Sequence, residues 1–240
     1  MTEVQQIEIA SLNTQNATAR FNMREARFNM IEQQIRAWEV LDPAVLALLN
    51  DVPRENFVPS EYTGLAFADI EIPLAEGQSM LHPKLEARML QALNVQKTHT
   101  ALHIGTGTGY FTALLASLAK HVVSIDIHAA LSQQAAKNLA QQNIQNVSLE
   151  VADGAFGRAG RVSQTFYDII VYTASSPVEP AGVRQQLNIG GTLLLVLGSA
   201  PAMQATRIQR VSETGFKQDV LFETCIPELL NAPQAPQFEF

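Results

Sequence analysis

Three glycines at alternate positions, Gly105, Gly107 and Gly109, form the part of the chain best suited to hold a ligand. They lie between an apolar stretch at 100–104 and an amphipathic stretch that starts at Tyr110, an order that predicts a strand, a tight turn and a helix start. Glycine lets the backbone turn sharply and approach a ligand closely, and the first N–H groups of a helix are free to bind it. The spacing differs from the Gly-x-Gly-x-x-Gly of dinucleotide-binding enzymes, because Tyr110 stands where their third glycine would be. A dehydrogenase is therefore disfavoured.

Acidic and polar residues follow the next three predicted strands. Asp126 comes 21 residues after Gly105, a separation at which a carboxylate can accept hydrogen bonds from ribose hydroxyls. Asp153-Gly154 ends the following run, and the segment 173–177, Thr-Ala-Ser-Ser-Pro, comes after the strand beyond it. Taken singly, each is also consistent with an ordinary turn residue that binds its own backbone. Because the carboxyl ends of parallel strands meet at one edge of a sheet, their common register favours a nucleoside site.

Strands and helices alternate along the second half of the chain. Short apolar runs predict strands at 100–104, 122–127, 147–151, 168–172 and 192–197, with a closing antiparallel pair at 204–211 and 217–227. Helices are expected at 85–93, 110–119, 131–142 and 180–187. This alternation is typical of the α/β class, and we expect a Rossmann-like, doubly wound, mostly parallel sheet with an N-terminal helical cap.

The chain is expected to divide into three parts. Residues 1–18 are polar and aperiodic, which favours a flexible tail. Residues 19–83 are expected to form the helical cap and the substrate-side segment, and residues 84–240 the Rossmann-like core. Within the cap, Asp42-Pro43 predicts a helix start, with Asp42 as the N-cap and Pro43 at the first helical position.

One short segment is duplicated within the cap. Ala-Arg-Phe-Asn-Met occurs at 19–23 and again at 26–30. A shift of seven residues is close to two helical turns, so Phe21, Phe28 and Ile35 are expected to share one face of a single helix that runs to about residue 39. One duplication is too short for a repeat architecture, and it predicts no function.

Composition excludes several classes of protein. The chain has 240 residues, 47% of them hydrophobic and 16% charged, which fits one soluble globular domain. Its net charge of −7 and the lack of a basic stripe disfavour a nucleic-acid partner. Cys225 is the only cysteine and the five histidines show no ligand spacing, so no metal site is expected. The longest strongly apolar run, 192–197, is too short to span a bilayer, and no signal peptide is visible, so we expect a cytoplasmic protein with no membrane partner.

The motifs together resemble a known family. Alternate glycines after the first core strand resemble motif I of the class I methyltransferases, which bind S-adenosyl-L-methionine. From about residue 27 onward the chain resembles the protein-L-isoaspartate O-methyltransferases. The segments that carry this likeness are 30–36, Met-Ile-Glu-Gln-Gln-Ile-Arg; 52–59, Val-Pro-Arg-Glu-Asn-Phe-Val-Pro; Gly77-Gln78 with Pro83; the glycine loop; Asp153-Gly154; 167–171; and 187–191. The segments before the glycine loop are the specific part, since many methyltransferases share motif I.

The resemblance implies an activity and a set of contacts. It implies methyl transfer from S-adenosyl-L-methionine to the free carboxylate of L-isoaspartyl residues in a damaged protein or peptide, which begins its repair. Such a carboxylate is ionised at neutral pH, so the reaction needs alignment more than a general base. Asp126 would then bind the ribose, and Asp153 would accept from the adenine amino group. The implied cofactor-binding residues are His103, Gly105, Thr106, Gly107, Gly109, Asp126, Ile127, Asp153 and Gly154.

Two positions depart from the family pattern. Leu81 stands at the position of the family's catalytic serine, and its neighbours Ser79 and His82 are the candidate catalytic residues. His103 stands where motif I has an acid near the methionyl part of the cofactor. It either accepts a hydrogen bond there or is a strand residue with partners of its own. The sequence thus leaves two functions open: an active isoaspartyl methyltransferase, and a divergent member with a shifted substrate or a non-catalytic role in binding a metabolite or partner.

Overall fold

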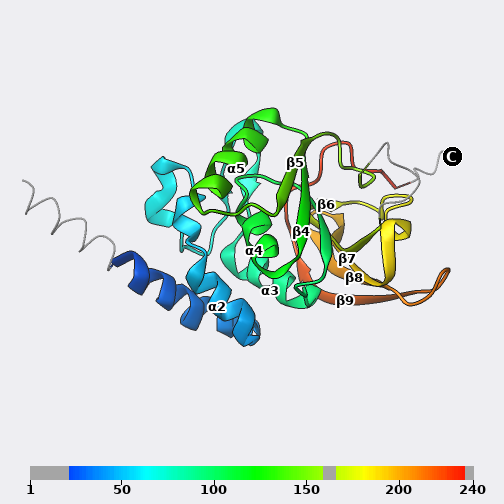
Figure 1. Cartoon of the computed structure of the whole chain (residues 1–240), viewed down its shortest axis with the longest axis horizontal. Coiled ribbons are helices and arrows are strands. Elements are labelled where there is room, and N and C mark those ends of the chain that lie inside the picture. Colours follow the sequence, from blue (N-terminus) through cyan, green and yellow to red (C-terminus); the bar gives the residue numbers. More distant parts are fainter. Residues whose placement is uncertain (1–21, 159–165, 236–240) are drawn as a thin grey trace, which may run out of the picture.

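A computed structural model describes residues 22–158 and 166–235. It contains a seven-stranded sheet, most of whose strands are labelled in Figure 1. The strand order is β5-β4-β3-β6-β7-β8-β9, and the first five strands in this order are parallel. β8 and β9 close the sheet as an antiparallel pair, as predicted. The strands are β3 (Thr100–Ile104), β4 (His121–Asp126), β5 (Val147–Val151), β6 (Tyr167–Ser176), β7 (Leu187–Ser199), β8 (Ala202–Arg210) and β9 (Phe216–Thr224). The predicted mostly parallel Rossmann-like sheet is confirmed.

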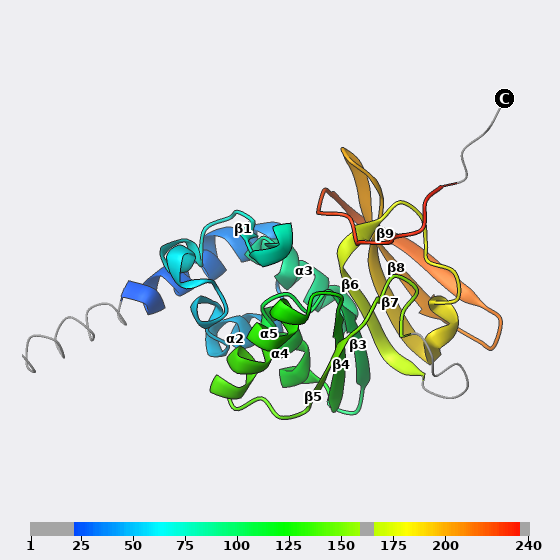
Figure 2. The same cartoon turned by 90° about the horizontal axis from the view of Figure 1, so that it is seen from above.

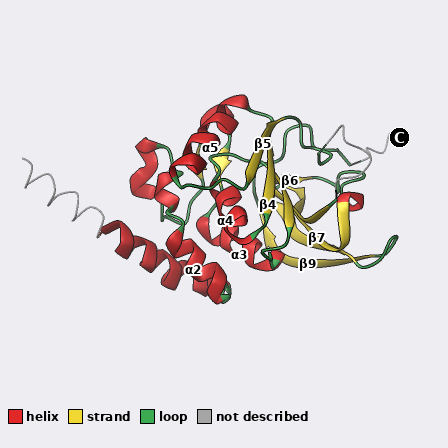
Figure 3. Ribbon diagram, in the orientation of Figure 1, coloured by secondary structure: helices red, strands yellow, loops and turns green. Residues whose placement is uncertain are grey.

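The helices of the core pack together on one side of this sheet (Figures 2 and 3). They are α3 (Pro83–Leu93), α4 (Tyr110–Leu118) and α5 (Ala129–Gln141), and α2 (Pro43–Asp51) packs against α3 and α4. The helix predicted at 180–187 is wrong. This connection contains only the 3-10 turn η6 (Arg184–Gln186). Gly182 has φ of +81°, which an α-helix does not accommodate, so the chain turns there instead of coiling. No described helix is long and apolar enough to cross a membrane.

The N-terminal helix changes its winding before it ends. Helical backbone runs from residue 22 into the π-helical segment Met30–Ile35 and the 3-10 turn Arg36–Trp38, close to the predicted end. The prediction that Phe28 and Ile35 share one face is wrong, because Phe28 is 58% exposed while Ile35 is buried. A π-helix has more residues per turn, so a spacing of seven residues no longer returns to the same face. Phe21 and the tail 1–18 lie outside the described residues.

The start of α2 forms as the sequence predicts. The Oδ1 atom of Asp42 accepts hydrogen bonds from the backbone N–H groups of Ala44 at 2.8 Å and Val45 at 3.4 Å. Pro43, the first helical residue, has no N–H group that would need a partner. This cap is typically worth about 1 kcal/mol.

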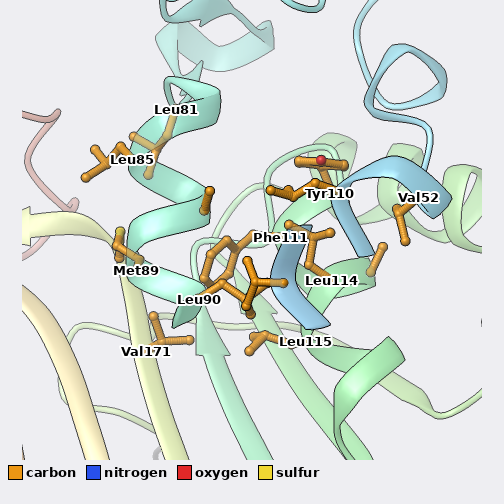
Figure 4. Packing of buried hydrophobic residues seen from close by; sticks show 14 of the residues in the cluster. Val52, Leu81, Leu85, Met89, Leu90, Tyr110, Phe111, Leu114, Leu115 and Val171 are labelled. Atoms are coloured by element: carbon orange, nitrogen blue, oxygen red, sulfur yellow. The ribbon is translucent and has the colours of Figure 1, made fainter. Parts of the chain in front are cut away.

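The segment before the sheet shares one hydrophobic core with it. Figure 4 shows Met89 and Leu90 of α3 in one cluster with Leu114 and Leu115 of α4, and Val171 of β6 below Met89. All five side chains are fully buried. This packing fixes α3 against the sheet, and with it the strand β2 (Ser79–Met80), which pairs antiparallel with β1 (Ile72–Pro73) just before α3 begins.

Candidate functional site

A cavity of about 880 Å³, including its solvent-open part, lies at the carboxyl ends of β3, β4 and β6. Open α/β sheets bind their ligands at this edge. Segment 78–81 forms another part of its wall. Among the described residues, no group of three His, Cys, Asp or Glu side chains is placed to hold a metal ion.

The glycine loop forms the floor of the cavity. Gly105, Gly107 and Gly109 all have positive φ, at 95°, 53° and 88°. A Cβ atom at Gly105 would lie 2.7 Å from the Thr173 hydroxyl, so a larger residue would displace the loop. Gly105 and Gly107 line the cavity, whereas Gly109 does not. Gly109 instead lets α4 pack closely against α5, because its Cβ atom would lie 3.1 Å from that of Ala135.

Asp126 joins this loop to the next strand. It is buried at the end of β4, where its Oδ2 accepts from the Gly107 N–H at 2.8 Å and its Oδ1 from the His128 N–H at 2.9 Å. Each carboxylate oxygen has a second lone pair, so both remain able to accept from a ligand hydroxyl. Ile127, the next residue in the chain, is exposed and lines the cavity. The structure therefore brings the predicted loop and acid together.

Asp153 and Gly154 line the cavity beside β5. Asp153 is exposed, and its Oδ1 accepts from the Ala155 N–H at 2.9 Å, as a turn residue does. Its Oδ2 accepts from the Asn231 side chain at 2.9 Å, which connects it to the C-terminal segment. A Cβ atom at Gly154 would lie 2.8 Å from the Ile104 side chain, so the close approach to β3 requires glycine.

The C-terminal segment forms a wall that sequence reasoning missed. Pro227, Leu229 and Leu230 line the cavity. The Ser175 N–H donates to the Pro227 carbonyl at 2.9 Å, and the Leu229 N–H donates to the Ser175 carbonyl at 2.8 Å. Because these two contacts to the end of β6 are made by backbone groups, no side-chain motif predicts them. Of the predicted segment 173–177, Thr173 and Ala174 line the cavity.

His103 lies behind the loop and does not line the cavity. Its Nδ1 is 2.8 Å from the Thr112 hydroxyl and 3.2 Å from that of Ser124, and its Nε2 is 3.0 Å from the Thr173 hydroxyl. The implied contact with the cofactor therefore finds no support in the geometry. The other role open to it, a strand histidine with its own partners, fits the structure. Thr106 does line the cavity, and its hydroxyl is 2.7 Å from that of Ser124.

Burial lowers the pKa of His103 to about 3, so the ring is neutral. Because the unfolded state takes up a proton below the ordinary histidine pKa and the folded state does not, stability falls as pH drops below about 6.5. Burial raises the pKa of Glu86 to about 7, so acidification stabilises the fold at that residue and partly cancels the effect. The effect of His103 on the pH dependence of stability is therefore measured by replacing His103 alone, so that Glu86 contributes equally to both proteins.

His103→Gln removes the titrating ring, and Glu86 is present on both sides of the comparison. Between pH 7 and pH 5, wild type should lose about 2 kcal/mol more unfolding free energy than the variant. Urea denaturation at both pH values measures this difference. Parallel losses in the two proteins would mean that His103 is protonated in the folded state. His121→Gln, a half-buried histidine on β4 outside the cavity, is the control.

The residue at the position of the family's serine and its two candidate substitutes differ in whether they line the cavity. Ser79 lines the cavity, and its hydroxyl donates to Glu71 at 2.8 Å. Leu81 is buried and lines the cavity, so the wall is apolar at the position of the family's serine. His82 does not line the cavity, and its Nδ1 lies 3.2 Å from a carboxylate oxygen of Asp69. Ser79 is the one of the two candidate catalytic side chains that the structure brings to the cavity.

A buried ion pair behind Leu81 was not predicted. Arg54 is fully buried and donates to the Ala66 carbonyl at 3.0 Å, to the Leu81 carbonyl at 2.6 Å and to the Glu86 carboxylate. Its guanidinium also stacks 5.0 Å from the centre of the Tyr110 ring. Glu86 lines the cavity. The sequence did carry a signal, since an acid stands on the otherwise apolar face of the predicted helix 85–93.

Comparisons with known proteins show which family the chain resembles. The family model for protein-L-isoaspartate(D-aspartate) O-methyltransferase matches residues 25–226. The protein-L-isoaspartate O-methyltransferase of Rhodopseudomonas palustris (strain ATCC BAA-98 / CGA009) is 37% identical, over 85% of this chain and 92% of that protein. Another enzyme of that name, from Syntrophus aciditrophicus (strain SB), is 35% identical over 79% and 86% of the two chains.

A crystal structure shows the same fold. It is of a Plasmodium falciparum protein described as a protein-L-isoaspartate O-methyltransferase, in complex with S-adenosyl-L-homocysteine. Its TM-score is 0.73 at 17% identity, and the match covers 86% of this chain and 97% of that one. With a family model that spans most of its length and relatives above one-third identity, the chain belongs to the protein-L-isoaspartate(D-aspartate) O-methyltransferase family.

Proposed function

We propose that this chain is an S-adenosyl-L-methionine-dependent methyltransferase that esterifies the free carboxylate of L-isoaspartyl residues in damaged proteins. The observation that carries the proposal is the cavity itself. Its floor is the glycine loop, and Asp126 and Asp153 stand at the ends of successive strands beside it. Family membership indicates the acceptor, since the relatives are named for isoaspartate.

The residues present fit the cofactor. The positive φ angles of Gly105 and Gly107 let the loop backbone itself line the cavity, and Asp126 keeps lone pairs free at the cavity wall. We expect Asp126 to hold the ribose and Asp153-Gly154 to lie beside the adenine. The cofactor supplies an electrophilic methyl group on a sulfonium. Pro227, Leu229 and Leu230 form an apolar part of the cavity wall.

The chain contributes positioning rather than proton transfer. The acceptor carboxylate is ionised at neutral pH, so no general base is required. Ser79 is the candidate for holding this carboxylate, and its hydroxyl would have to leave Glu71 to do so. Leu81 offers no donor, and His82 lies outside the cavity wall. The catalytic roles of Ser79 and His82 therefore remain predictions.

The test is methyl transfer to an isoaspartyl peptide, measured as volatile methanol released from the labelled ester. A matched peptide with normal aspartate is the control acceptor, and activity on the isoaspartyl peptide alone supports the proposal. If the cofactor binds and neither peptide is methylated, the acceptor is a different one, and the divergent alternative takes its place. If no cofactor binds, the methyltransferase assignment is wrong.

Asp126→Ala should weaken S-adenosyl-L-methionine binding by about 1.5–3 kcal/mol, the scale of a hydrogen bond to a charged group. The variant also loses the bond that holds the Gly107 N–H, so the loop is less well ordered for the ligand. Isothermal titration calorimetry measures the change. Asp51→Ala, at the exposed end of α2, is the control and should bind as wild type does. An unchanged dissociation constant in Asp126→Ala would contradict the ribose assignment.

Partners and location remain predictions. A damaged protein or peptide is the partner that the proposed reaction requires. The expectations of no nucleic-acid partner, no membrane partner and a cytoplasmic location come from the sequence alone.

A further inference from the structure

Several carboxylate side chains line the cavity, without a lysine or arginine beside them among the described residues. Its lining includes three carboxylates, those of Glu86, Asp126 and Asp153, and no lysine or arginine among the described residues. Asp126 and Asp153 stand at strand ends, where the ribose and adenine are proposed to lie. Glu86 comes from α3, and Leu81, which also lines the cavity, lies just before that helix. The third acid therefore belongs to a different part of the cavity wall.

The proposed cofactor has one cationic group that still lacks an acceptor. Its methionyl part ends in an α-ammonium, and His103 would accept it by resemblance. The His103 ring nitrogens are instead bound by hydroxyls of Thr112, Ser124 and Thr173, and the ring is neutral. An ammonium inside a partly buried cavity needs an anionic or neutral acceptor, because removing it from water is costly.

The Glu86 carboxyl group is fixed by one partner and can accept further hydrogen bonds. Arg54 donates to its Oε2 atom and, among the described residues, is the only hydrogen-bond partner of this carboxyl group. Arg54 is itself fixed by the Ala66 and Leu81 carbonyls. Burial outweighs the attraction of Arg54 and raises the pKa of Glu86 to about 7. One arginine thus compensates the buried carboxylate incompletely, and a second cation would complete it.

We propose that Glu86 binds the α-ammonium group of the cofactor's methionyl part, the role that the family pattern gives to the position of His103. The inference rests on the proposed function, since it requires the same cofactor in the same cavity. The competing role for Glu86 is purely structural, as the counter-ion of Arg54. The two roles differ in one respect: only the first depends on the ligand's amino group.

Isothermal titration calorimetry at pH 8 with three ligands separates these roles. The ligands are S-adenosyl-L-homocysteine, its analogue with hydrogen in place of the amino group, and 5′-methylthioadenosine, which lacks the whole amino-acid part. Glu86→Gln should weaken binding of the first about 10- to 150-fold and leave the other two within about twofold. Glu55→Gln is the matched control, because Glu55 is also a largely buried partner of an arginine, Arg27, but does not line the cavity.

Equal weakening of all three ligands by Glu86→Gln would overturn the proposal and leave a structural role. Wild type gives a second measurement that needs no variant to fold. It should bind S-adenosyl-L-homocysteine at least about tenfold more tightly than the deaminated analogue. No preference for the amino group would also overturn the proposal. Failure of wild type to bind any of the three ligands would instead overturn the proposed function, on which this inference rests.

Discussion

Arg54→Met is expected to lower the free energy of unfolding by about 3–5 kcal/mol, because it leaves the Glu86 carboxylate buried without a counter-ion. The Ala66 and Leu81 carbonyls lose their donor in the same step. The deficit should increase with pH, since an unpaired buried carboxyl has to take up a proton and does so less readily as pH rises. Urea denaturation at pH 6 and pH 8 measures both effects.

Two variants control this prediction. The double variant Arg54→Met/Glu86→Leu removes both charges of the pair, so it should recover most of the stability that Arg54→Met loses. Arg36→Met removes a solvent-exposed arginine that pairs with Glu32, and it should cost less than about 1 kcal/mol. If Arg54→Met and Arg36→Met cost the same, or if the double variant is no more stable than Arg54→Met, the buried pair does not act as described.

Leu81→Ser should raise methyl transfer to an isoaspartyl peptide about 10- to 150-fold in kcat/KM, the range for one hydrogen bond to a charged group. The backbone at this position is already held, because the Leu81 carbonyl accepts from Arg54. A serine hydroxyl would therefore enter the cavity wall without rebuilding the segment. The substitution also empties a buried site, which typically costs about 2–5 kcal/mol of stability.

Leu81→Ala is the matched control, since it creates the same space without a hydroxyl. Methanol release from the labelled ester is compared among wild type, Leu81→Ser and Leu81→Ala. A rise in Leu81→Ser alone supports the prediction. Equal activity of the two variants would show that space, and not the hydroxyl, matters. Strong wild-type activity with no gain in Leu81→Ser would show that Ser79 or backbone groups already position the carboxylate.

The sheet was predictable because its signals are local. Apolar runs bounded by turns mark each parallel strand, and β3 and β5 begin and end at the predicted residues. The errors arise where one residue overrides a pattern. Gly182 interrupts the spacing that indicated a helix at 180–187, and the π-helical winding at Met30–Ile35 turns Phe28 outward.

The site was predictable to the extent that it is built from turns. The loop glycines and Asp126 follow directly from spacing along the chain. The orientation of His103 does not, because it depends on hydroxyls supplied by Thr112 on α4 and Thr173 on β6. The Arg54–Glu86 pair joins residues 32 positions apart, and no local pattern encodes that contact.

The wall formed by Pro227, Leu229 and Leu230 begins just beyond residue 226, where the match to the family model ends. The matched residues therefore carry the glycine loop and the strand-end acids, and the residues that follow them supply one wall of the cavity. Because Asn231 in the same stretch donates to Asp153, a substitution there acts on the proposed adenine end of the cavity as well as on its wall.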